Sequence, residues 1–556
     1  MSQEFSFQTR GQALSRLRTE EFDVLVIGGG ITGAAVAREC LSRGLTVGLV
    51  ERKDISYGTS SRSSKLIHGG LRYLENFEFR LVFEALAERA LLLRTAPSMV
   101  RPLPFYFPVY EGDRPSKRML GLGMWLYDLL ALFRAPGFHK NLSREELISE
   151  IPTLRSEGLQ GGFRYFDASM WDDVLGVEIL RNATFHGGAI ASYVEATRPF
   201  FEGDRLTGFY LRDAEDGSEF LSRARQVIVC AGPWTDELGS RLQRDWKPWL
   251  KPSKGVHLIF DLKRLKVPGA MVMAHPDDGR ISFVIPRKDF GDGVVIVGTT
   301  DGPTPADPDR AEITQDDIHY LLTLLNRFFP ELSFEESDVL SAYIGVRPLM
   351  APPSGESASL QKISREHHID SGAGGAVLVA GGKYTTHRTM AREIVDHASQ
   401  KNVHLRQRVK TRFSTESPIN PRTTHDALER ARQHPRAAGI ESALWERYGA
   451  EALELLQIEH EYPPVTDSPP GFPRIEAQLR FCIRMGMVVH LEDFYFRRVP
   501  LFSARADHGL PWLDRLAEVW AEELERSADQ RETEKKALRA EVAARESWRK
   551  SGSARI

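Results

Sequence analysis

The chain has 556 residues, which is too long for a single compact core, so we expect two or three domains. Its 42% hydrophobic and 27% charged residues are typical of a globular protein, and its net charge of −3 argues against a general nucleic-acid binder. The three cysteines are far apart, so the sequence favours neither a disulfide framework nor a zinc site, and we predict no metal.

The first predicted unit is a strand, a glycine turn, a helix and a second strand. Residues 22–27 form an apolar run that predicts a buried parallel strand. Small and apolar side chains at helical spacing predict a helix over residues 31–43, and residues 45–50 form the next strand. The turn therefore lies at the positive end of a helix, where phosphate is stabilised.

Three glycines of this turn, Gly28, Gly30 and Gly33, match the pattern G-x-G-x-x-G of dinucleotide-binding proteins. Glu51 ends the second strand at the distance expected for an acid that accepts hydrogen bonds from ribose hydroxyls. An acid at this position disfavours a 2′-phosphate and hence NADP. NAD and FAD share the pattern, so these residues leave the choice between the two open.

The most apolar stretch of the chain covers residues 119–133 and is too short to span a membrane. Lys117, Arg118 and Arg134 flank it. We expect an ordinary buried helix, and an interfacial membrane helix is the alternative. The first twenty residues lack the apolar stretch of a signal peptide, so we expect a cytoplasmic protein.

Two later apolar runs, at residues 226–230 and 376–380, each end at glycine and predict strands of the same nucleotide-binding sheet. Alternating patterns at residues 256–260, 281–285 and 294–297 predict antiparallel strands of a second domain that covers the substrate. After residue 400, helical patterns dominate. They cover residues 424–436, 443–457, 475–489 and 512–523, and the charged tail at 525–549 is either a solvated helix or a frayed end.

Residues 63–75, with the sequence SSKLIHGGLRYLE, resemble a motif of the FAD-dependent glycerol-3-phosphate dehydrogenase family of the aerobic type. The resemblance covers most of residues 20–400 and includes four further motifs in the family's order. These are KGVH at 254–257, GTTD at 298–301, GVRPL at 345–349 and GGKYTT at 381–386.

The resemblance implies an α/β fold with a Rossmann-like FAD-binding domain, an interleaved antiparallel-sheet substrate domain and a C-terminal helical domain. The expected boundaries are an N-terminal extension (1–20), FAD-binding parts (21–90, 226–245 and 351–400), mixed substrate and FAD-domain segments (91–225), a substrate-binding part (246–350) and the helical domain (401–556).

The resemblance also implies non-covalently bound FAD and oxidation of sn-glycerol 3-phosphate to dihydroxyacetone phosphate, with hydride transfer to flavin N5. Membrane-associated members of the family pass electrons to quinone, whereas oxidase relatives use O₂. Peripheral contact with the inner face of the cell membrane is therefore expected if quinone is the acceptor, and a homodimer is an open possibility. We expect the cofactor to contact Gly28, Gly30, Ile31, Thr32, Gly33, Glu51, Arg52, Thr59, Ser60, Ser61, Ser64, Lys65, Leu66, His68, Ala231, Gly232, Gly382, Lys383, Thr385 and Thr386.

The substrate phosphate requires fixed cations, and planar guanidinium groups hold it with two hydrogen bonds. The residues that match the family's substrate site are Arg72, Tyr73, Arg347, Arg365 and Lys383. Lys383 would also stabilise negative charge near the flavin. His68 is a candidate general base, with a structural role as an equal alternative, and the identity of the base stays open. We expect Arg347, Lys383 and His68 to take part in catalysis.

The chain departs from the family pattern at Ala35, Glu39 and His387, and in the C-terminal domain at Gly486. Residues 491–498 retain the D-x-x-x-R-R ending of a family motif. Two other functions are considered. One is an oxidase of the same fold that uses O₂ or acts on a related hydroxy or amino substrate. The other is a flavin-binding protein that has lost turnover, which the joint presence of the substrate-site residues argues against.

Overall fold

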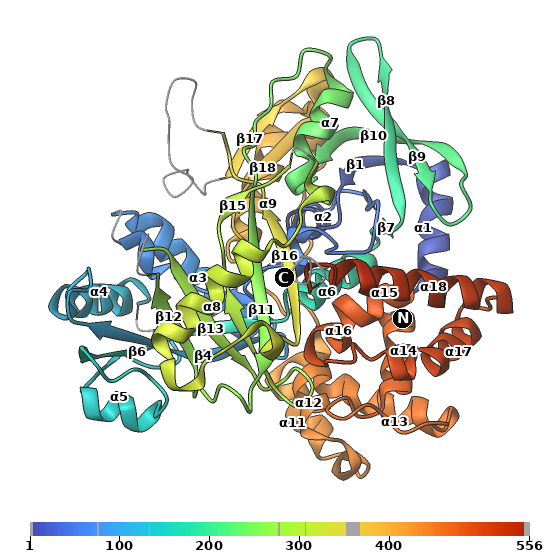
Figure 1. The fold of residues 1–556 in the computed structure, drawn as a ribbon. Helices are drawn as coiled ribbons and strands as arrows, with labels where there is room; N and C mark the ends of the chain where they lie inside the picture. Colours follow the sequence, from blue (N-terminus) through green and yellow to red (C-terminus); the bar gives the residue numbers. More distant parts are fainter. Residues whose placement is uncertain are drawn as a thin grey trace.

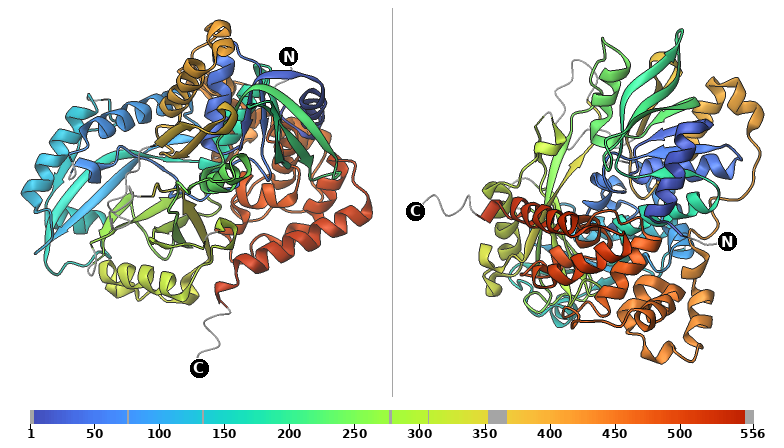
Figure 2. Two further views of the ribbon diagram at one scale, coloured as in Figure 1. Left: turned by 90° about the horizontal axis from the view of Figure 1, so that it is seen from above. Right: turned by 90° about the vertical axis from the view of Figure 1, so that its right-hand side faces the viewer.

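The computed structural model describes residues 4–74, 77–132, 134–275, 279–305, 307–351 and 367–549. They form two β-sheets and a C-terminal set of helices (Figure 1). The first sheet lies in the upper part of that view, the second at the lower left, and the C-terminal helices at the lower right. The views in Figure 2 separate the same three parts from other directions.

The first sheet has the parallel core predicted for nucleotide binding. Its strands follow the order β17-β18-β10-β1-β2-β7, and β9 and β8 extend it beside β10. Their bounds are Glu21–Ile27 (β1), Val47–Val50 (β2), Ala189–Ala191 (β7), Val194–Glu202 (β8), Arg205–Asp213 (β9), Glu219–Val229 (β10), His367–Ser371 (β17) and Val377–Gly381 (β18). Because β1 pairs in parallel with β2 and β10, and β10 with β18, the prediction of one sheet from distant segments is confirmed.

Helices cover both faces of this sheet because successive residues of β1 point to opposite sides. Val24 and Val26 face the core that contains helices α2 (Ile31–Ser42), α6 (Asp172–Phe185) and α9 (His387–Lys401). Leu25 and Ile27 face the core that contains α1 (Phe7–Thr19) and α7 (Thr235–Leu242). The N-terminal extension is thus a packed helix, and its buried Arg10 forms an ion pair with Asp213.

The second sheet follows the order β15-β11-β14-β13-β12-β4-β6-β3, with β16 beside β11 and β5 beside β6. Its strands are β3 (Leu66–Ile67), β4 (Val100–Tyr110), β5 (Lys140–Leu142), β6 (Leu159–Met170), β11 (Ser253–Asp261), β12 (Ala270–Ala274), β13 (Ile281–Arg287), β14 (Val294–Gly298), β15 (Gly302–Pro303) and β16 (Ser341–Arg347). The antiparallel pairing of β11 with β14 and of β14 with β13 confirms the strands predicted there. Helices α3 (Phe79–Thr95), α4 (Lys117–Leu130), α5 (Arg144–Glu150) and α8 (Gln315–Phe328) pack against this sheet.

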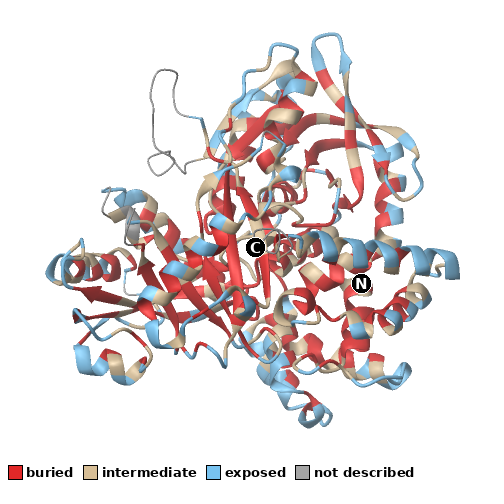
Figure 3. Cartoon of the chain, in the orientation of Figure 1, coloured by how far each residue is buried: buried red, intermediate tan, exposed pale blue. Residues whose placement is uncertain are grey.

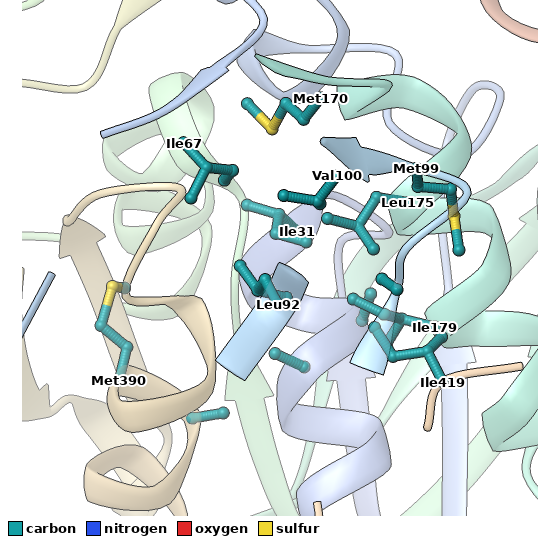
Figure 4. Close-up of a cluster of buried hydrophobic side chains, with 14 of the residues drawn as sticks. Ile31, Ile67, Leu92, Met99, Val100, Met170, Leu175, Ile179, Met390 and Ile419 are labelled. Atoms are coloured by element: carbon teal, nitrogen blue, oxygen red, sulfur yellow. The ribbon is translucent and has the colours of Figure 1, made fainter. Parts of the chain in front are cut away.

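Segments of the two sheets alternate along the chain. Strand β3 lies inside the predicted range 21–90 of the FAD-binding domain, but it pairs with β6 of the second sheet. A shared core joins the parts, as Figure 4 shows. In that cluster, side chains of α2, α3, α6 and α9 meet side chains of the second sheet, with Ile31, Ile67, Leu92, Val100, Met170, Leu175, Ile179 and Met390 among the labelled residues.

The C-terminal domain is helical as predicted, with one correction. Its elements include α10 (Val403–Arg408), α11 (His425–Arg432), α12 (Ser442–Tyr448), α13 (Ala452–Glu461), α14 (Ile475–Met485), α15 (Leu491–Asp493), α16 (Leu501–Ala504), α17 (Leu513–Glu523) and α18 (Ala528–Arg545). The single helix predicted over 443–457 is wrong. The chain breaks between α12 and α13 because Gly449 takes a positive φ of 57°, which few residues other than glycine adopt in a helix.

The charged tail is the ordered helix α18 rather than a frayed end. Leu538 and Val542 bury one side of it in the C-terminal core. Beyond it, Trp548 is 2% exposed and packs in the core beneath the second sheet, and Arg549 donates hydrogen bonds to the carbonyls of Val339 and Leu340. The tail therefore ties the C-terminal domain to the part of the molecule that contains the second sheet.

The expectation of a buried helix at residues 119–133 is wrong, and Phe133 itself lies outside the described residues. In α4, Leu120, Met124 and Tyr127 face the core, whereas the opposite stripe is in solvent (Figure 3). The exposed residues of that stripe and its surroundings are Phe77, Phe79, Phe83, Met119, Leu122, Trp125, Leu129, Leu132 and Phe138. We call these nine residues the apolar patch. Throughout the described ranges, every helix is too short or too polar to cross a bilayer.

Candidate active site

The glycine turn between β1 and α2 has the geometry that dinucleotide binding requires. Gly28 has a φ of 111°, and a Cβ there would lie 2.4 Å from the carbonyl oxygen of Cys230. A Cβ at Gly33 would lie 1.9 Å from the carbonyl oxygen of Gly28, so helix and turn touch only because both are glycine. Gly30 is the N-cap of α2 and leaves the helix N-terminus open to a phosphate.

Glu51 stands at the end of β2 beside this turn. Its carboxylate accepts hydrogen bonds from the N–H groups of Gly29 (2.7 Å) and Lys53 (2.9 Å). Burial raises the pKa of Glu51, and these two backbone bonds act against that rise. The carboxylate keeps further lone pairs that can accept hydrogen bonds. Next to it, Arg52 forms an ion pair with Asp309 at 2.7 Å.

Side chains of the short helix η1 (Thr59–Ser61) close the turn from the other side. Ser60 Oγ accepts a hydrogen bond from the Ile31 N–H at 2.9 Å, and Thr59 Oγ1 donates one to the Val346 carbonyl at 2.5 Å. Ser61 Oγ donates to backbone carbonyls of its own loop. The loop is therefore fixed both to the nucleotide turn and to β16 of the second sheet.

These elements surround a cavity of about 350 Å³ that both sheets line. Its size is within the range of cofactor and substrate pockets. Seventeen of the predicted site residues lie on its wall, namely Gly28, Gly30, Ile31, Thr32, Glu51, Arg52, Thr59, Ser60, Ser64, Leu66, His68, Ala231, Gly232, Arg347, Gly382, Lys383 and Thr385. The structure thus brings together motifs from three distant parts of the chain at one site.

Four predicted cofactor contacts lie behind the wall of the cavity. Gly33 serves the packing of α2, and Ser61 is held in its loop. Lys65 is buried, and its ammonium group forms ion pairs with Asp172 and with Asp173. Thr386 is the N-cap of α9, and its Oγ1 donates to the Lys383 carbonyl at 3.5 Å. Lys65 turns to Asp172 and Asp173 because a buried cation is costly unless carboxylates offset its charge.

Three predicted substrate residues cannot be placed in the site. The backbone of Arg72 and Tyr73 forms the short helix η2 (Leu71–Leu74), but their side chains lie outside the described residues. Arg365 lies outside the described residues altogether. Their assignment to the substrate therefore stays a prediction.

Arg347 ends β16 on the cavity wall and is held by backbone and side-chain oxygens. Its guanidinium donates to Thr299 Oγ1 (3.0 Å), to the Lys254 carbonyl (3.1 Å) and to the Thr300 carbonyl (3.2 Å), and it lies 3.3 Å from Asp301 Oδ1. Lys383 follows β18 on the same wall, and its Nζ is shielded from solvent. A planar donor and an ammonium group thus line one cavity, an arrangement that suits an anionic ligand.

His257, the last residue of the KGVH motif, lies on β11 at the wall of the cavity. Its Nε2 is hydrogen-bonded to Ser64 Oγ at 2.9 Å, and its ring stacks on Tyr343 at 4.6 Å. Burial, followed by the nearby charges of Arg347 and Lys65, lowers the pKa of His257 to about 3. The imidazole is therefore neutral near pH 7 and holds Ser64 against the second sheet.

Sequence reasoning also missed several residues of the wall. Arg62 interrupts the serine run between Ser61 and Ser63, and Trp234 follows Gly232 by two positions. Both residues are adjacent in sequence to recognised motifs, and that adjacency could have identified them as candidates. A different case is Asp54, whose buried carboxylate pairs with Arg497 and Arg498 of the C-terminal domain. No local pattern connects residues so far apart.

Comparison with known proteins places this site in a family. The family described as FAD dependent oxidoreductase matches residues 23–396, and the C-terminal domain of alpha-glycerophosphate oxidase matches residues 419–531. A glycerol-3-phosphate dehydrogenase of Mycobacterium leprae is 35% identical over 526 residues, which cover 92% of this chain and 87% of the relative. An alpha-glycerophosphate oxidase of Streptococcus pneumoniae is 31% identical, with 97% and 98% covered.

A solved structure agrees over nearly the whole chain. The glycerol-3-phosphate dehydrogenase of Bacillus halodurans, crystallised with FAD, superposes with a TM-score of 0.78 and 26% identity, and 97% of this chain and 98% of that one are covered. The glycine turn without side chains, the acid at the end of β2 and the cavity that continues to the second sheet fit FAD. The chain therefore belongs to the FAD-dependent glycerol-3-phosphate dehydrogenase family, and its cofactor is FAD.

Proposed function

We propose that the protein oxidises sn-glycerol 3-phosphate to dihydroxyacetone phosphate and passes the electrons to a quinone. The observation that carries this proposal is the cavity in which the nucleotide turn meets Arg347, Lys383 and His68. The relatives named as glycerol-3-phosphate dehydrogenases and glycerophosphate oxidase support the substrate. When bound, FAD supplies the hydride acceptor at N5.

The phosphate of the substrate calls for cations that stay charged and ordered. Arg347 meets that requirement because hydroxyl and carbonyl oxygens already hold its guanidinium in one orientation, so little further entropy is lost on binding. We propose that Arg347 and Lys383 bind the substrate, together with Arg72, Tyr73 and Arg365. Lys383 also stabilises negative charge that develops on the reacting oxygen.

Removal of the hydroxyl proton requires a base on the cavity wall. Two histidines are available there, His68 and His257. The low pKa of His257 makes its imidazole a weak proton acceptor, and it already holds Ser64. We therefore propose His68 as the base and His257 as a support for the loop.

A direct test is to add glycerol 3-phosphate to the purified FAD-bound protein without oxygen. Loss of the flavin absorbance band is expected, and an unbleached flavin would contradict the proposed substrate. Glycine and proline serve as comparison substrates, because an amino-substrate oxidase would respond to them instead. Reoxidation by a soluble quinone analogue faster than by O₂ separates the dehydrogenase from an oxidase. A protein that binds FAD but reduces with none of these substrates is the turnover-deficient alternative.

A quinone acceptor lies in a membrane, and the apolar patch is the part of the surface suited to reach it. Trp125, Leu122 and Met119 are 64%, 68% and 61% exposed on one stripe of α4. Arg118 and Arg134 stand exposed at its two ends. Apolar and aromatic side chains flanked by basic residues are typical of a helix that lies in the interface of an anionic bilayer. We propose that this patch binds the cytoplasmic face of the cell membrane.

Flotation with vesicles of phosphatidylcholine and phosphatidylglycerol tests the patch. The double variant Leu122→Glu, Trp125→Glu is expected to bind at least about tenfold more weakly, because it places charge where apolar side chains would enter the bilayer. Val465→Glu is the matched control, since Val465 is 70% exposed in the C-terminal domain. Equal binding of the double variant and the control would exclude the patch, and flavin reduction by glycerol 3-phosphate should persist in both.

A further inference from the structure

Three polar side chains are fully enclosed beneath the loop that carries His68. Arg89 of α3, Tyr127 of α4 and Asp167 of β6 are 0%, 2% and 1% exposed. The Tyr127 hydroxyl donates to the Asp167 carboxylate at 2.9 Å, and the Arg89 guanidinium forms an ion pair with the same carboxylate. Arg89 also donates to the Phe166 carbonyl at 2.8 Å. We call these three residues the buried triad.

The triad is bonded to one backbone group of the loop. The Gly69 N–H donates to Tyr127 Oη at 3.0 Å and to Asp167 Oδ1 at 3.3 Å. The contact leaves no room for a side chain, because a Cβ at Gly69 would lie 2.5 Å from Tyr127 Oη and 2.4 Å from a methyl group of Leu86. Gly70 then turns the chain with a φ of 74°. The loop thus contacts the triad closely through Gly69.

Gly69 lies between two parts of the site. His68, the residue before Gly69, lines the cavity, and Leu71 starts η2, which carries Arg72 and Tyr73. Between β3, which ends at Ile67, and η2 the chain has no regular secondary structure of its own. The orientation of residues 68–70 therefore depends on bonds from outside the loop, and the triad supplies them.

Stability alone is a weak reason for such a cluster. A buried ion pair costs desolvation, and apolar residues of the same volume often stabilise a core equally well. A hydroxyl and a carboxylate aimed at the same N–H fix direction as well as distance, which apolar packing does not. The arrangement is thus suited to orienting the loop.

We propose that Tyr127 is a positioning residue, which acts with Asp167 and Arg89 to fix the Gly69–Gly70 turn and thereby the orientation of His68 toward the cavity. The proposal rests on the proposed oxidation of glycerol 3-phosphate. Burial, and then the charge of Asp167, raises the pKa of Tyr127 well above its usual range. The hydroxyl therefore keeps its proton, donates to Asp167 and accepts from Gly69 at every working pH.

The test is Tyr127→Phe in the full FAD-bound protein, with Tyr165→Phe as the matched control. Tyr165 is also buried, and its ring lies 5.9 Å from that of Tyr127. Among the described residues, no hydrogen bond joins the Tyr165 hydroxyl to Gly69 or Asp167. For Tyr127→Phe we expect unchanged FAD content, altered visible circular dichroism of the flavin, and a kcat/KM about 10- to 100-fold lower. The control should match the natural protein in all three.

A merely structural role predicts a different pattern. Both variants would then lose thermal stability, while the flavin spectrum, KM and kcat stay unchanged, and that result overturns the proposal. Asp167→Asn keeps the shape of the triad without its charge, and it should give the same spectral change if Tyr127→Phe does not fold. The spectral measurement needs no substrate. Failure of glycerol 3-phosphate to reduce the natural protein would contradict the proposed function and leave this measurement interpretable.

Discussion

Arg347 and Arg497 carry the same side chain in opposite surroundings. Arg497 is enclosed by the carboxylates of Asp54 and Asp493, so its charge is neutralised within the protein. Arg347 has a side chain that is 25% exposed, and it donates to the Thr299 hydroxyl and the Lys254 carbonyl and lies 3.3 Å from the Asp301 carboxylate. Arg347 lies on the wall of the cavity, where its guanidinium can meet an anion, whereas Arg497 serves the fold.

For Arg347→Ala we expect FAD to stay bound while transition-state stabilisation falls by about 2–4 kcal/mol, because a charge-assisted bond to the substrate is lost. That corresponds to a kcat/KM about 30- to 1000-fold lower in steady-state assays with glycerol 3-phosphate. Arg310→Ala is the control, since the Arg310 side chain is 81% exposed. Unchanged kcat/KM in Arg347→Ala would remove this residue from the site.

At this scale the sequence predicted residue types and motifs better than individual contacts. The roles of Gly28 and Gly33 could be predicted from the motif because a Cβ at either position would clash with the backbone. The ion pair of Lys65 could not be predicted, since its partner Asp172 lies far along the chain and the pairing is a property of the folded state. The contact of His257 with Ser64 could not be predicted for the same reason, because the two residues are far apart along the chain.

Helices α4 and α18 are elements whose existence, but not whose packing, follows from the sequence. Periodicity predicts a helix in both places, yet one was expected to be buried and the other solvated or frayed. In the structure α4 exposes much of the apolar patch, whereas α18 is a largely solvated helix that buries Leu538 and Val542 on one side. Which face of a helix finds a neighbour depends on the arrangement of the other elements, and local periodicity does not contain it.

The packing of the tail predicts a stability effect. For Trp548→Ala we expect a loss of about 3–5 kcal/mol in the free energy of unfolding of the parts it joins, as is usual when a buried tryptophan is truncated. Trp125→Ala is the control, because Trp125 is 64% exposed. Thermal unfolding and limited proteolysis of the tail measure the effect. A thermal unfolding midpoint for Trp548→Ala equal to that of the control would show that Trp548 does not stabilise the protein.

On the scale of the whole molecule, buried charges hold the C-terminal domain to the nucleotide sheet. Asp54, three residues beyond Glu51, accepts hydrogen bonds from both Arg497 and Arg498, and Tyr193 donates to Asp493 at 2.6 Å. The D-x-x-x-R-R motif that supplies Asp493 and these two arginines is recognisable in the sequence. Their contact with Asp54 could not be predicted, because only the folded domains bring Asp54 to them.

His490 belongs to the same junction and predicts a pH dependence. Burial alone would lower its pKa, but hydrogen bonds to Glu215 and Glu534 (3.0 Å each) and nearby carboxylates raise it to about 11. Since this value lies above that of an unfolded histidine, the charged form stabilises the fold fully below about pH 6.5. That stabilisation is lost as the pH rises toward 11.

The stability difference between the natural protein and His490→Gln should therefore be largest near pH 6 and shrink steadily as the pH rises toward 11. Urea unfolding at several pH values measures this difference. His404→Gln, at an exposed position, is the control and should show no such trend. A difference for His490→Gln that stays constant from pH 6 to pH 10 would contradict the assignment of a charged imidazole.

The strand order of the first sheet also has a consequence for synthesis. Strand β1 leaves the ribosome early, but β10, its parallel neighbour, ends at Val229, and β18, next to β10, ends at Gly381. At usual elongation rates, the interval between β1 and β18 is on the order of 20–70 s. During that time the apolar edge of β1 has no complete sheet to join. The complete FAD-binding sheet can therefore form only after β18 has been synthesised.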